Sequence, residues 1–224
     1  MRNAVEQQTQ TNKGARVQMF IAVVLVLGTL FAATQAGAQQ KSPVTPTTIT
    51  PPAGNTAFLL GQAKVGTQGY VCLPTATGAS WTVNNARPEA ALFTNFLGRD
   101  FQIITHFLSP NTNPSGPDPV PFGNATWQSS VDSSAVWAKA LSPNVTAGTD
   151  ASCPNVGSIP CLLLQSVGSK EGPTGGKYLT KTTYIQRLNT KGGTAPATGC
   201  SVAGDVGKQV LVPYTADYYF FSAN

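Results

Sequence analysis

Residues 183–221 read TYIQRLNTKGGTAPATGCSVAGDVGKQVLVPYTADYYFF. They combine alternating side chains, a glycine pair, a cysteine and an aromatic closing segment. Over residues 177–188, successive side chains fall alternately on two faces, which is the period of a β-strand. Residues 217–221 predict a last strand that pairs inside the sheet, because its aromatic rings bury large apolar areas. This stretch therefore places the end of the chain in a β-sheet.

The rest of the chain follows the same pattern. Short apolar or alternating runs are separated by turn residues, and the chain holds 22 Gly and 17 Pro. Only residues 87–93 predict a helical turn, since Pro88 and Glu89 suit the first positions of a helix. We therefore predict one all-β domain, a sandwich or a flattened barrel of short, mainly antiparallel strands with long Pro/Gly loops and little helix. The expected strands are residues 57–65, 69–73, 81–83, 101–108, 125–128, 134–141, 159–167, 177–188, 209–213 and 217–221, and residues 110–123 are an expected surface loop.

Residues 1–38 predict an export signal. Basic residues precede an apolar run over residues 17–33, and small residues at positions 36–38 offer a site for signal peptidase. Cleavage after Ala38 is expected, with an uncleaved membrane anchor as the alternative. We expect a secreted or periplasmic protein that has no membrane contact after cleavage.

A flexible leader rich in Thr and Pro is predicted at residues 39–53, before the folded domain at residues 54–224. Removal of the signal takes away three basic residues and one acidic residue, which lowers the formal net charge from +5 to +3. The remaining Lys and Arg residues are scattered singly. The sequence therefore gives no support for nucleic acid binding.

Four cysteines follow the signal: Cys72, Cys153, Cys161 and Cys200. In an exported chain an even count indicates two disulfides. A metal site is the alternative, but the sequence has no CxxC motif and only one histidine. The short loop from Cys153 to Cys161 contains Pro and Gly residues that let its ends meet. Of the three pairings we predict Cys153–Cys161 and Cys72–Cys200, and we expect no metal and no cofactor.

A series of motifs also occurs in order along residues 52–221. The motifs are PAGN at 52–55, YVC at 70–72, Trp81, PEAALF at 88–93, THF at 105–107, TW at 126–127, LLL at 162–164, YIQRLNTKGG at 184–193, PATGC at 196–200 and PYTADYYF at 213–220. In these motifs the chain resembles DUF3455, a domain of unknown function in exported proteins of bacteria and fungi. The resemblance implies an exported β-rich domain without an assigned activity. Asn124 and Asn144 begin glycosylation sequons, which matter only in a eukaryotic source.

Some relatives of this kind carry a malate dehydrogenase label. Such an enzyme needs a glycine-rich turn between a strand and a helix, followed by an acidic residue at the next strand end. The chain has no such turn before a helix. The residues therefore do not support malate dehydrogenase activity.

His106 is the only histidine, so every histidine-dependent mechanism depends on it. A packed structural histidine is the first interpretation, and the alternative is a hydrolase in which His106 acts with Glu89 or Asp217. The sequence contains neither a GxSxG nor an HExxH motif. For Asp217 we expect a structural role, as an acceptor for backbone N–H groups or for Arg187.

The candidate ligand-binding residues are Arg187, Lys191, Trp127 and Tyr184. Arg187 and Lys191 precede a glycine pair, so the ordinary interpretation of this region is a turn. The alternative is that the two cations bind a small anion. The aromatic residues of the last strand are interpreted as core and sheet-edge residues, and the alternative is that they stack sugars or pair with another chain. The leading hypothesis is an exported, disulfide-braced structural or binding module that is not an enzyme, with a glycan or a small anion as ligand.

Overall fold

The computed structural model describes residues 40–109 and 124–224, with the backbone alone at residues 84–88 and 124. The chain divides into Met1–Gln39 and Gln40–Asn224, and the second part is a compact unit. It contains two short 3-10 helices, η1 (Thr47–Ile49) and η2 (Ala203–Asp205), and the strands β1 (Asn55–Thr75), β2 (Gly78–Phe96), β3 (Arg99–Ser109), β4 (Asn124–Ser129), β5 (Ala135–Ala140), β6 (Leu162–Lys170), β7 (Thr182–Gly192) and β8 (Gln209–Ala223). The all-β prediction is confirmed.

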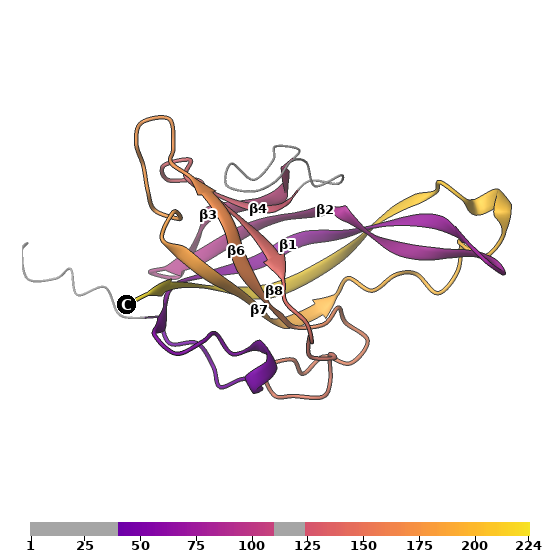
Figure 1. Ribbon diagram of the computed structural model, residues 1–224, viewed down its shortest axis with the longest axis horizontal. Coiled ribbons are helices and arrows are strands. Elements are labelled where there is room, and N and C mark those ends of the chain that lie inside the picture. Colours follow the sequence, from indigo (N-terminus) through magenta and orange to yellow (C-terminus); the bar gives the residue numbers. More distant parts are fainter. Residues whose placement is uncertain (1–39, 110–123) are drawn as a thin grey trace, which may run out of the picture. The chain divides into compact units, whose positions relative to one another are not determined.

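The strands form one antiparallel sheet that closes on itself. Each strand pairs with the next one along the chain, and β8 pairs back with β1. Figure 1 shows the first and last strands side by side. Of the two architectures predicted from the sequence, the chain therefore adopts the barrel. Within the described residues, no helix has the length and apolar character needed to cross a membrane.

The barrel interior is the first of two hydrophobic cores. All eight strands contribute side chains to it, which identifies it as the inside of the closed sheet. Strand β8 shows the alternation clearly, since Ala216, Tyr218 and Phe220 belong to this core. The largest fully buried side chains of the interior are Trp127, Tyr218, Phe220, Leu92, Ile104, Leu179 and Ile185.

The second core lies on the outer face of the barrel wall. Tyr219 and Phe221 of β8 contribute to it, together with residues of β1, β6 and β7, and it is covered by η1 and the β5–β6 connection. Ile49 of η1 is fully buried, and its backbone oxygen accepts a hydrogen bond from Gln186 Nε2 at 2.6 Å. The described part of the predicted flexible leader is therefore packed near Ile49, and the folded domain begins before residue 54.

Beyond the barrel, β1, β2 and β8 continue as a long twisted arm (Figure 1). The β1–β2 pairing runs to Thr75 and Gly78, and β8 pairs with β1 as far as Val71. The 3-10 helix η2 belongs to the connection between β7 and β8 that packs along this arm. A disulfide between Cys72 of β1 and Cys200 ties that connection to the arm.

Both disulfides are present with the pairings expected from the sequence. Cys72 pairs with Cys200 across 128 positions, and Cys153 pairs with Cys161 across 8. The second bridge closes the β5–β6 connection over the outer core, where both sulfurs are fully buried. No described cysteine is free.

Three local predictions are corrected. Residues 87–93 are not a helical turn but part of β2, which pairs with β1 on one side and β3 on the other. The two strands expected around Gly66 are a single strand β1, whose register shifts near that glycine. The strand expected from residue 177 begins only at Thr182. The predicted surface loop at residues 110–123 lies outside the described residues.

Candidate functional site

The barrel wall separates the three residues of the hydrolase hypothesis. His106 is buried on the inner face, where its ring stacks on Trp127 of the interior core. Glu89 is exposed, because its neighbour Ala90 points into the barrel. Asp217 lies on the outer face for the same reason, since the residues on either side of it are interior. His106 therefore meets neither carboxylate.

His106 is held as a neutral structural group. Its ring lies 4.1 Å from that of Trp127 at an interplanar angle of 9°, and Tyr218 is 5.6 Å away. Nδ1 lies 2.8 Å from the backbone oxygen of Thr126, which can only accept, so Nδ1 carries the proton and donates it. Burial lowers the pKa of His106 to about 4, and the positive charge of Arg187 acts in the same direction. This histidine packs the barrel rather than transferring protons.

The depressed pKa of His106 predicts a loss of stability in mild acid. The unfolded chain takes up a proton near pH 6.5, whereas the folded chain takes it up near pH 4. The stability contributed by the neutral His106 is therefore fully present above pH 6.5 and is lost as the pH drops towards 4. The expected loss is about 3 kcal/mol, from about 1.4 kcal/mol for each unit of pKa difference. Denaturant unfolding of the parent and of His106→Gln, each near pH 7 and near pH 4, measures it.

The His106→Gln variant isolates this effect because it removes the titrating group. The variant is less stable at both pH values, but its stability should change far less between them. Two aspartates with lowered pKa values, Asp205 and Asp132, titrate below the pH range from 6.5 to 4. The hydrogen bond from Lys208 lowers the pKa of Asp205 to about 2. Burial raises the pKa of Asp132, but hydrogen bonds from Tyr178 and Ser134 outweigh it and lower the pKa to about 2. Equal pH dependence in parent and variant would contradict a buried neutral His106.

Arg187 and Lys191 do not form a common anion-binding site. Arg187 pairs with the interior residue Tyr218, is half-buried, and donates from Nη2 to the backbone oxygen of Pro160 at 2.9 Å. Its Nε is buried and has no hydrogen-bond partner among the described residues. Lys191 is exposed and pairs with Thr215 on the outer face. An extra residue in β7 between them breaks the alternation that would have put both on one face.

The two aromatic candidates are also on opposite sides of the wall. Trp127 is 1 % exposed inside the barrel. Tyr184 is half-buried against the outer core. Two tyrosines of the interior core are hydrogen-bonded to each other, since the hydroxyls of Tyr214 and Tyr218 lie 2.9 Å apart. The aromatic residues of the last strand are thus core residues, and no open aromatic platform is found among them.

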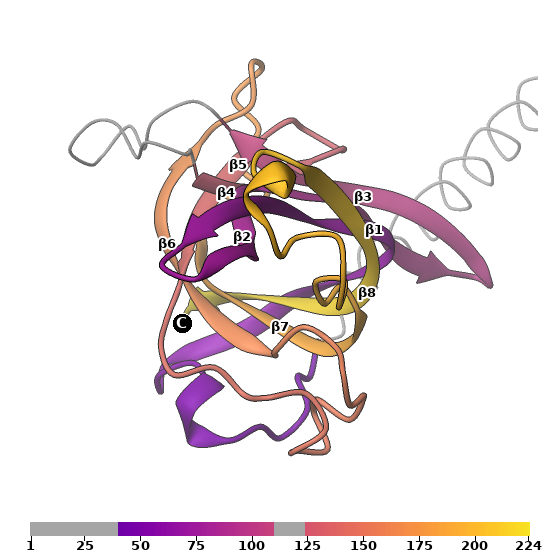
Figure 2. The ribbon, with the colours of Figure 1, turned by 90° about the vertical axis from the view of Figure 1, so that its right-hand side faces the viewer.

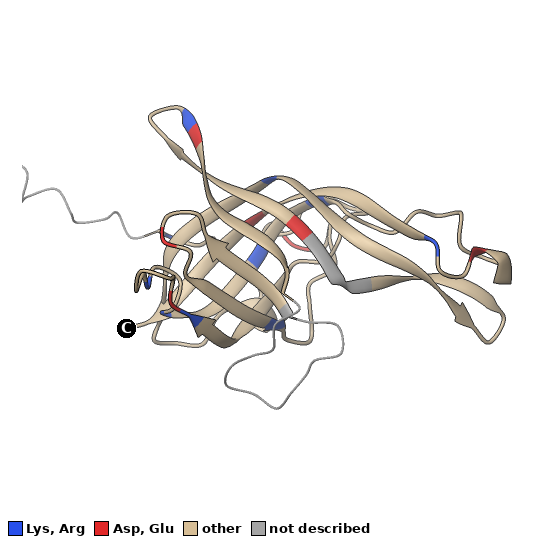
Figure 3. Ribbon diagram, turned by 90° about the horizontal axis from the view of Figure 1, so that it is seen from above, with Lys and Arg blue, Asp and Glu red and all other residues tan. Residues whose placement is uncertain are grey.

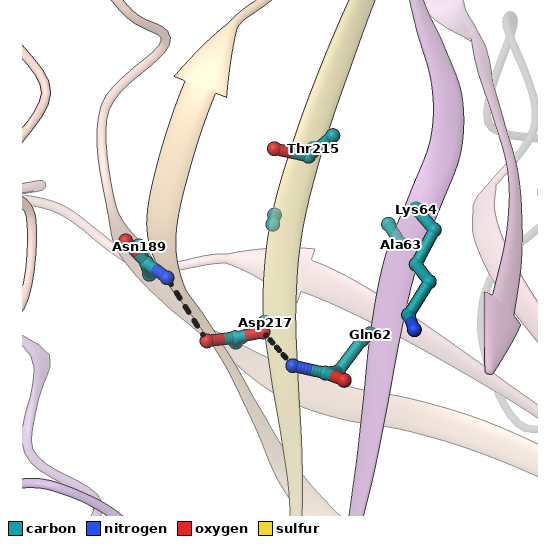
Figure 4. A pocket seen from close by; sticks show the side chains of 7 residues that line it. Gln62, Ala63, Lys64, Asn189, Thr215 and Asp217 are labelled. Carbon is teal, nitrogen blue, oxygen red and sulfur yellow. Dashed lines mark hydrogen bonds between the residues drawn. The ribbon is translucent and has the colours of Figure 1, made fainter. Parts of the chain in front are cut away.

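A groove opens on the outer face where β8 runs between β1 and β7 (Figure 4). Both neighbours of β8 carry one extra residue at this level. In β1, residues 63 and 66 pair with residues 216 and 214, and in β7, residues 188 and 191 pair with residues 217 and 215. Such bulges bend and twist the strand locally. Asn189 in the β7 bulge has a positive φ of 49°. The two bulges together hollow the wall around Thr215.

The groove has a volume of about 350 Å³ and a polar lining. Its centre is Asp217, whose Oδ1 accepts a hydrogen bond from Gln62 Nε2 at 3.1 Å and whose Oδ2 accepts one from Asn189 Nδ2 at 3.2 Å (Figure 4). Lys64 also lines the groove, and its ammonium group pairs with Asp100. Asp217 is therefore an acceptor, as expected, but its partners are two side-chain amides and not Arg187.

Residues 52–222 match the model of a family described as a protein of unknown function, DUF3455. The chain belongs to the DUF3455 family. Neither a curated protein nor a solved structure matches the chain. The resemblance inferred from the motifs is thereby confirmed over almost the whole compact unit of this DUF3455 protein.

The groove of this DUF3455 domain is suited to hydrogen bonding. It offers one carboxylate, two amides, the Thr215 hydroxyl and an ammonium group. None of the described lining residues is a histidine or a cysteine, and Asp217 is the only carboxylate among them. Within the described residues, no group of three or more His, Cys, Asp or Glu side chains is placed to hold a metal ion.

Sequence reasoning found Asp217 but missed Gln62, Asn189 and Thr215. These three residues come together only through the register of β8 with its neighbours. One signal was available, because Asn tolerates positive φ and often marks a bulge or turn. Asn189 shortly precedes the glycine pair at 192–193 in the DUF3455 motif, and that spacing pointed to an irregular strand end.

Proposed function

We propose that this protein is a non-catalytic binding module of an extracytoplasmic compartment, and that the groove at Asp217 holds a small hydroxyl-rich ligand such as a saccharide unit. The observation that carries the proposal is the arrangement of Gln62, Asp217 and Asn189, three planar polar groups fixed on adjacent strands by mutual hydrogen bonds. A preorganised set of this kind costs little ordering on binding.

The chemistry of the groove favours a neutral polyol over an anion. The Asp217 carboxylate accepts only one hydrogen bond on each oxygen from the amides, which leaves acceptor capacity for ligand hydroxyls. The amide groups of Gln62 and Asn189 add both donors and acceptors. An anionic ligand would face the negative charge of Asp217, while the one cation among the described lining residues, Lys64, is already paired with Asp100. Of the two ligand classes expected from the sequence, the glycan is the better supported.

The extracytoplasmic location is part of the proposal. Two disulfides are compatible with an oxidising compartment, and residues 1–38 have the pattern of an export signal. The intact mass of the exported protein tests this part. A chain that begins at Gln39 supports it, and a chain that retains the apolar run contradicts it.

The hydrolase hypothesis receives no support from the geometry. Its base, His106, is inside the barrel and neutral, and both proposed carboxylates are on the outer face. A general base must reach a substrate proton within hydrogen-bond distance. His106 does not meet that requirement in this fold.

Substitution of Asp217 tests the groove. Saturation-transfer NMR against a panel of common mono- and disaccharides should detect binding to the parent protein. Asp217→Ala should weaken that binding by at least about tenfold, because hydrogen bonds to a charged group contribute about 1.5–3 kcal/mol each. Asp217→Asn, which keeps the shape, should have an intermediate effect.

Glu171→Ala is the matched control. Glu171 is an exposed carboxylate paired with Lys177 in the β6–β7 connection, away from the groove residues. It should leave saccharide binding unchanged. If no saccharide binds the parent, or if Asp217→Ala binds as the parent does, the groove is not the ligand site.

A further inference from the structure

The hairpin turn between β2 and β3 has an unusual residue at its centre. Phe96 pairs with Arg99, so the turn consists of Leu97 and Gly98 alone, and both have positive φ, 51° and 76°. This is the pattern of the tight turns that favour Asn, Asp or Gly. Leucine is disfavoured there because its Cβ approaches the following carbonyl oxygen. A strained residue that persists at a turn points to a role other than stability.

The hairpin carries this turn away from the barrel. The pairing of β1 with β2 begins only at Phe93, and that of β3 with β4 begins only at Ile104. Residues 94–102, here called the β2–β3 tip, are therefore a two-stranded ribbon with no further strand beside it. Figures 2 and 3 show the connection between β2 and β3 standing out from the rest of the sheet.

The two faces of the β2–β3 tip differ in polarity. Paired residues share a face, so Asn95 and Asp100 lie on one side, where Asn95 Nδ2 donates to Asp100 Oδ1 at 3.0 Å and Lys64 pairs with the same carboxylate. Phe96 and Phe101 lie on the other side. They are 63 % and 49 % exposed, and Leu97 at the end is 87 % exposed. The tip is thus amphipathic, with an uncovered apolar face.

Arg99 adds a positive charge to the apolar face. It is the cross-strand partner of Phe96, it is exposed, and it forms no ion pair with a described residue. On the polar face, Asp100 and Lys64 balance each other. The β2–β3 tip therefore presents three apolar side chains together with one unbalanced cation.

We propose that the β2–β3 tip inserts into the surface of a lipid bilayer, with Leu97, Phe96 and Phe101 among the acyl chains and Arg99 at anionic headgroups. A second copy of this chain is a poorer occupant. Even a fully buried aromatic side chain covers only about 150–250 Å², so the tip falls short of the roughly 800 Å² per partner in a stable protein interface. A bilayer needs no matching surface and accepts a narrow apolar projection beside a snorkelling Arg.

The inference is independent of the saccharide groove and revises the expectation of no membrane contact. It describes a reversible peripheral contact and not a span. The charge on Arg99 fits anionic headgroups, so binding should strengthen with their content in the bilayer.

Flotation with lipid vesicles tests the proposal. Residues 40–224 are used, because both cores and both disulfides lie in this compact unit. The protein should float with phosphatidylcholine vesicles that contain phosphatidylglycerol, and less with phosphatidylcholine alone. Leu97→Asn should lower the bound fraction by about tenfold, since it removes the most exposed apolar side chain. Arg99→Gln should lower binding only to the vesicles that contain phosphatidylglycerol.

The melting temperature separates lost binding from lost folding. Asn adopts positive φ readily, so Leu97→Asn should melt no lower than the parent. Val156→Asn is the matched control, because Val156 is 84 % exposed but lies in the β5–β6 connection, and it should float like the parent. A parent that floats with neither vesicle, or a Leu97→Asn variant that floats like the parent, overturns the proposal. A concentration-dependent dimer that Leu97→Asn abolishes also overturns it, in favour of a protein partner.

Discussion

A chain that ends at Ala216 is expected not to fold. The deleted end of β8 holds Tyr218 and Phe220 in the interior core and Tyr219 and Phe221 in the outer core, and none of the four is more than 9 % exposed. Deletion of one large buried aromatic side chain costs about 3–5 kcal/mol. Four such losses amount to about 12–20 kcal/mol, which matches or exceeds the total stability of an ordinary domain, about 5–15 kcal/mol. The truncated chain should be absent from the soluble fraction and show no cooperative melting by circular dichroism.

A chain that ends at Phe221 is the control for this truncation. It keeps all four rings and loses only Ser222, Ala223 and Asn224. The losses include the hydrogen bond from the Asn224 N–H to the Gly54 oxygen at 2.9 Å, so a small decrease in melting temperature is expected. If the chain ending at Ala216 is soluble and melts like the parent, β8 is not part of the folding unit and its last segment is better explained as an assembly strand.

The second large effect concerns the two disulfides. Cys200→Ser should destabilise the protein by about 5 kcal/mol and Cys161→Ser by about 2.5 kcal/mol, because the freed loops differ in length and the entropy of the unfolded chain grows with the loop. The loops span 128 and 8 positions. Denaturant unfolding of the two variants under oxidising conditions measures the difference.

Partner variants provide the control for the disulfide prediction. Cys72→Ser frees the same long loop, so its effect should match that of Cys200→Ser. Equal destabilisation by Cys161→Ser and Cys200→Ser would contradict the entropic explanation. It would instead point to packing around Cys161, which is fully buried in the outer core.

Local sequence patterns predicted the strands well where side chains alternate or where large apolar side chains follow one another. The alternating residues 184–188 lie in the central strand β7, and the aromatic run 218–221 lies in the central strand β8. The pattern failed at residues 87–93, where Pro88 and Glu89 suggested a helix. Those residues lie in a long strand whose pairing with β1 is irregular between Gln68 and Tyr70, and an irregular stretch of ladder tolerates a proline.

The candidate site was harder to predict than the fold because it depends on register. Asp217 was recognised as a structural acceptor, yet its partners Gln62 and Asn189 are 155 and 28 positions away. Gln62 is the direct partner of Asp217 in the β1–β8 pairing, and Asn189 belongs to the β7 bulge that follows Leu188, the β7 partner of Asp217. The same bulge turned Lys191 outwards while Arg187 stayed inside. Side-chain alternation predicts the face of a residue only while the strand is regular.

Closure of the sheet by β1 and β8 has a consequence for the order of events during synthesis. Asn55 pairs with Ala223, so the ring cannot close on β1 before β8 has been synthesised. Contacts between such distant residues slow folding, because a long loop must be ordered before they form. We expect the nascent chain to remain open until β8 has left the ribosome. An open chain is the form that a narrow translocation channel admits, so this topology is compatible with the export proposed above.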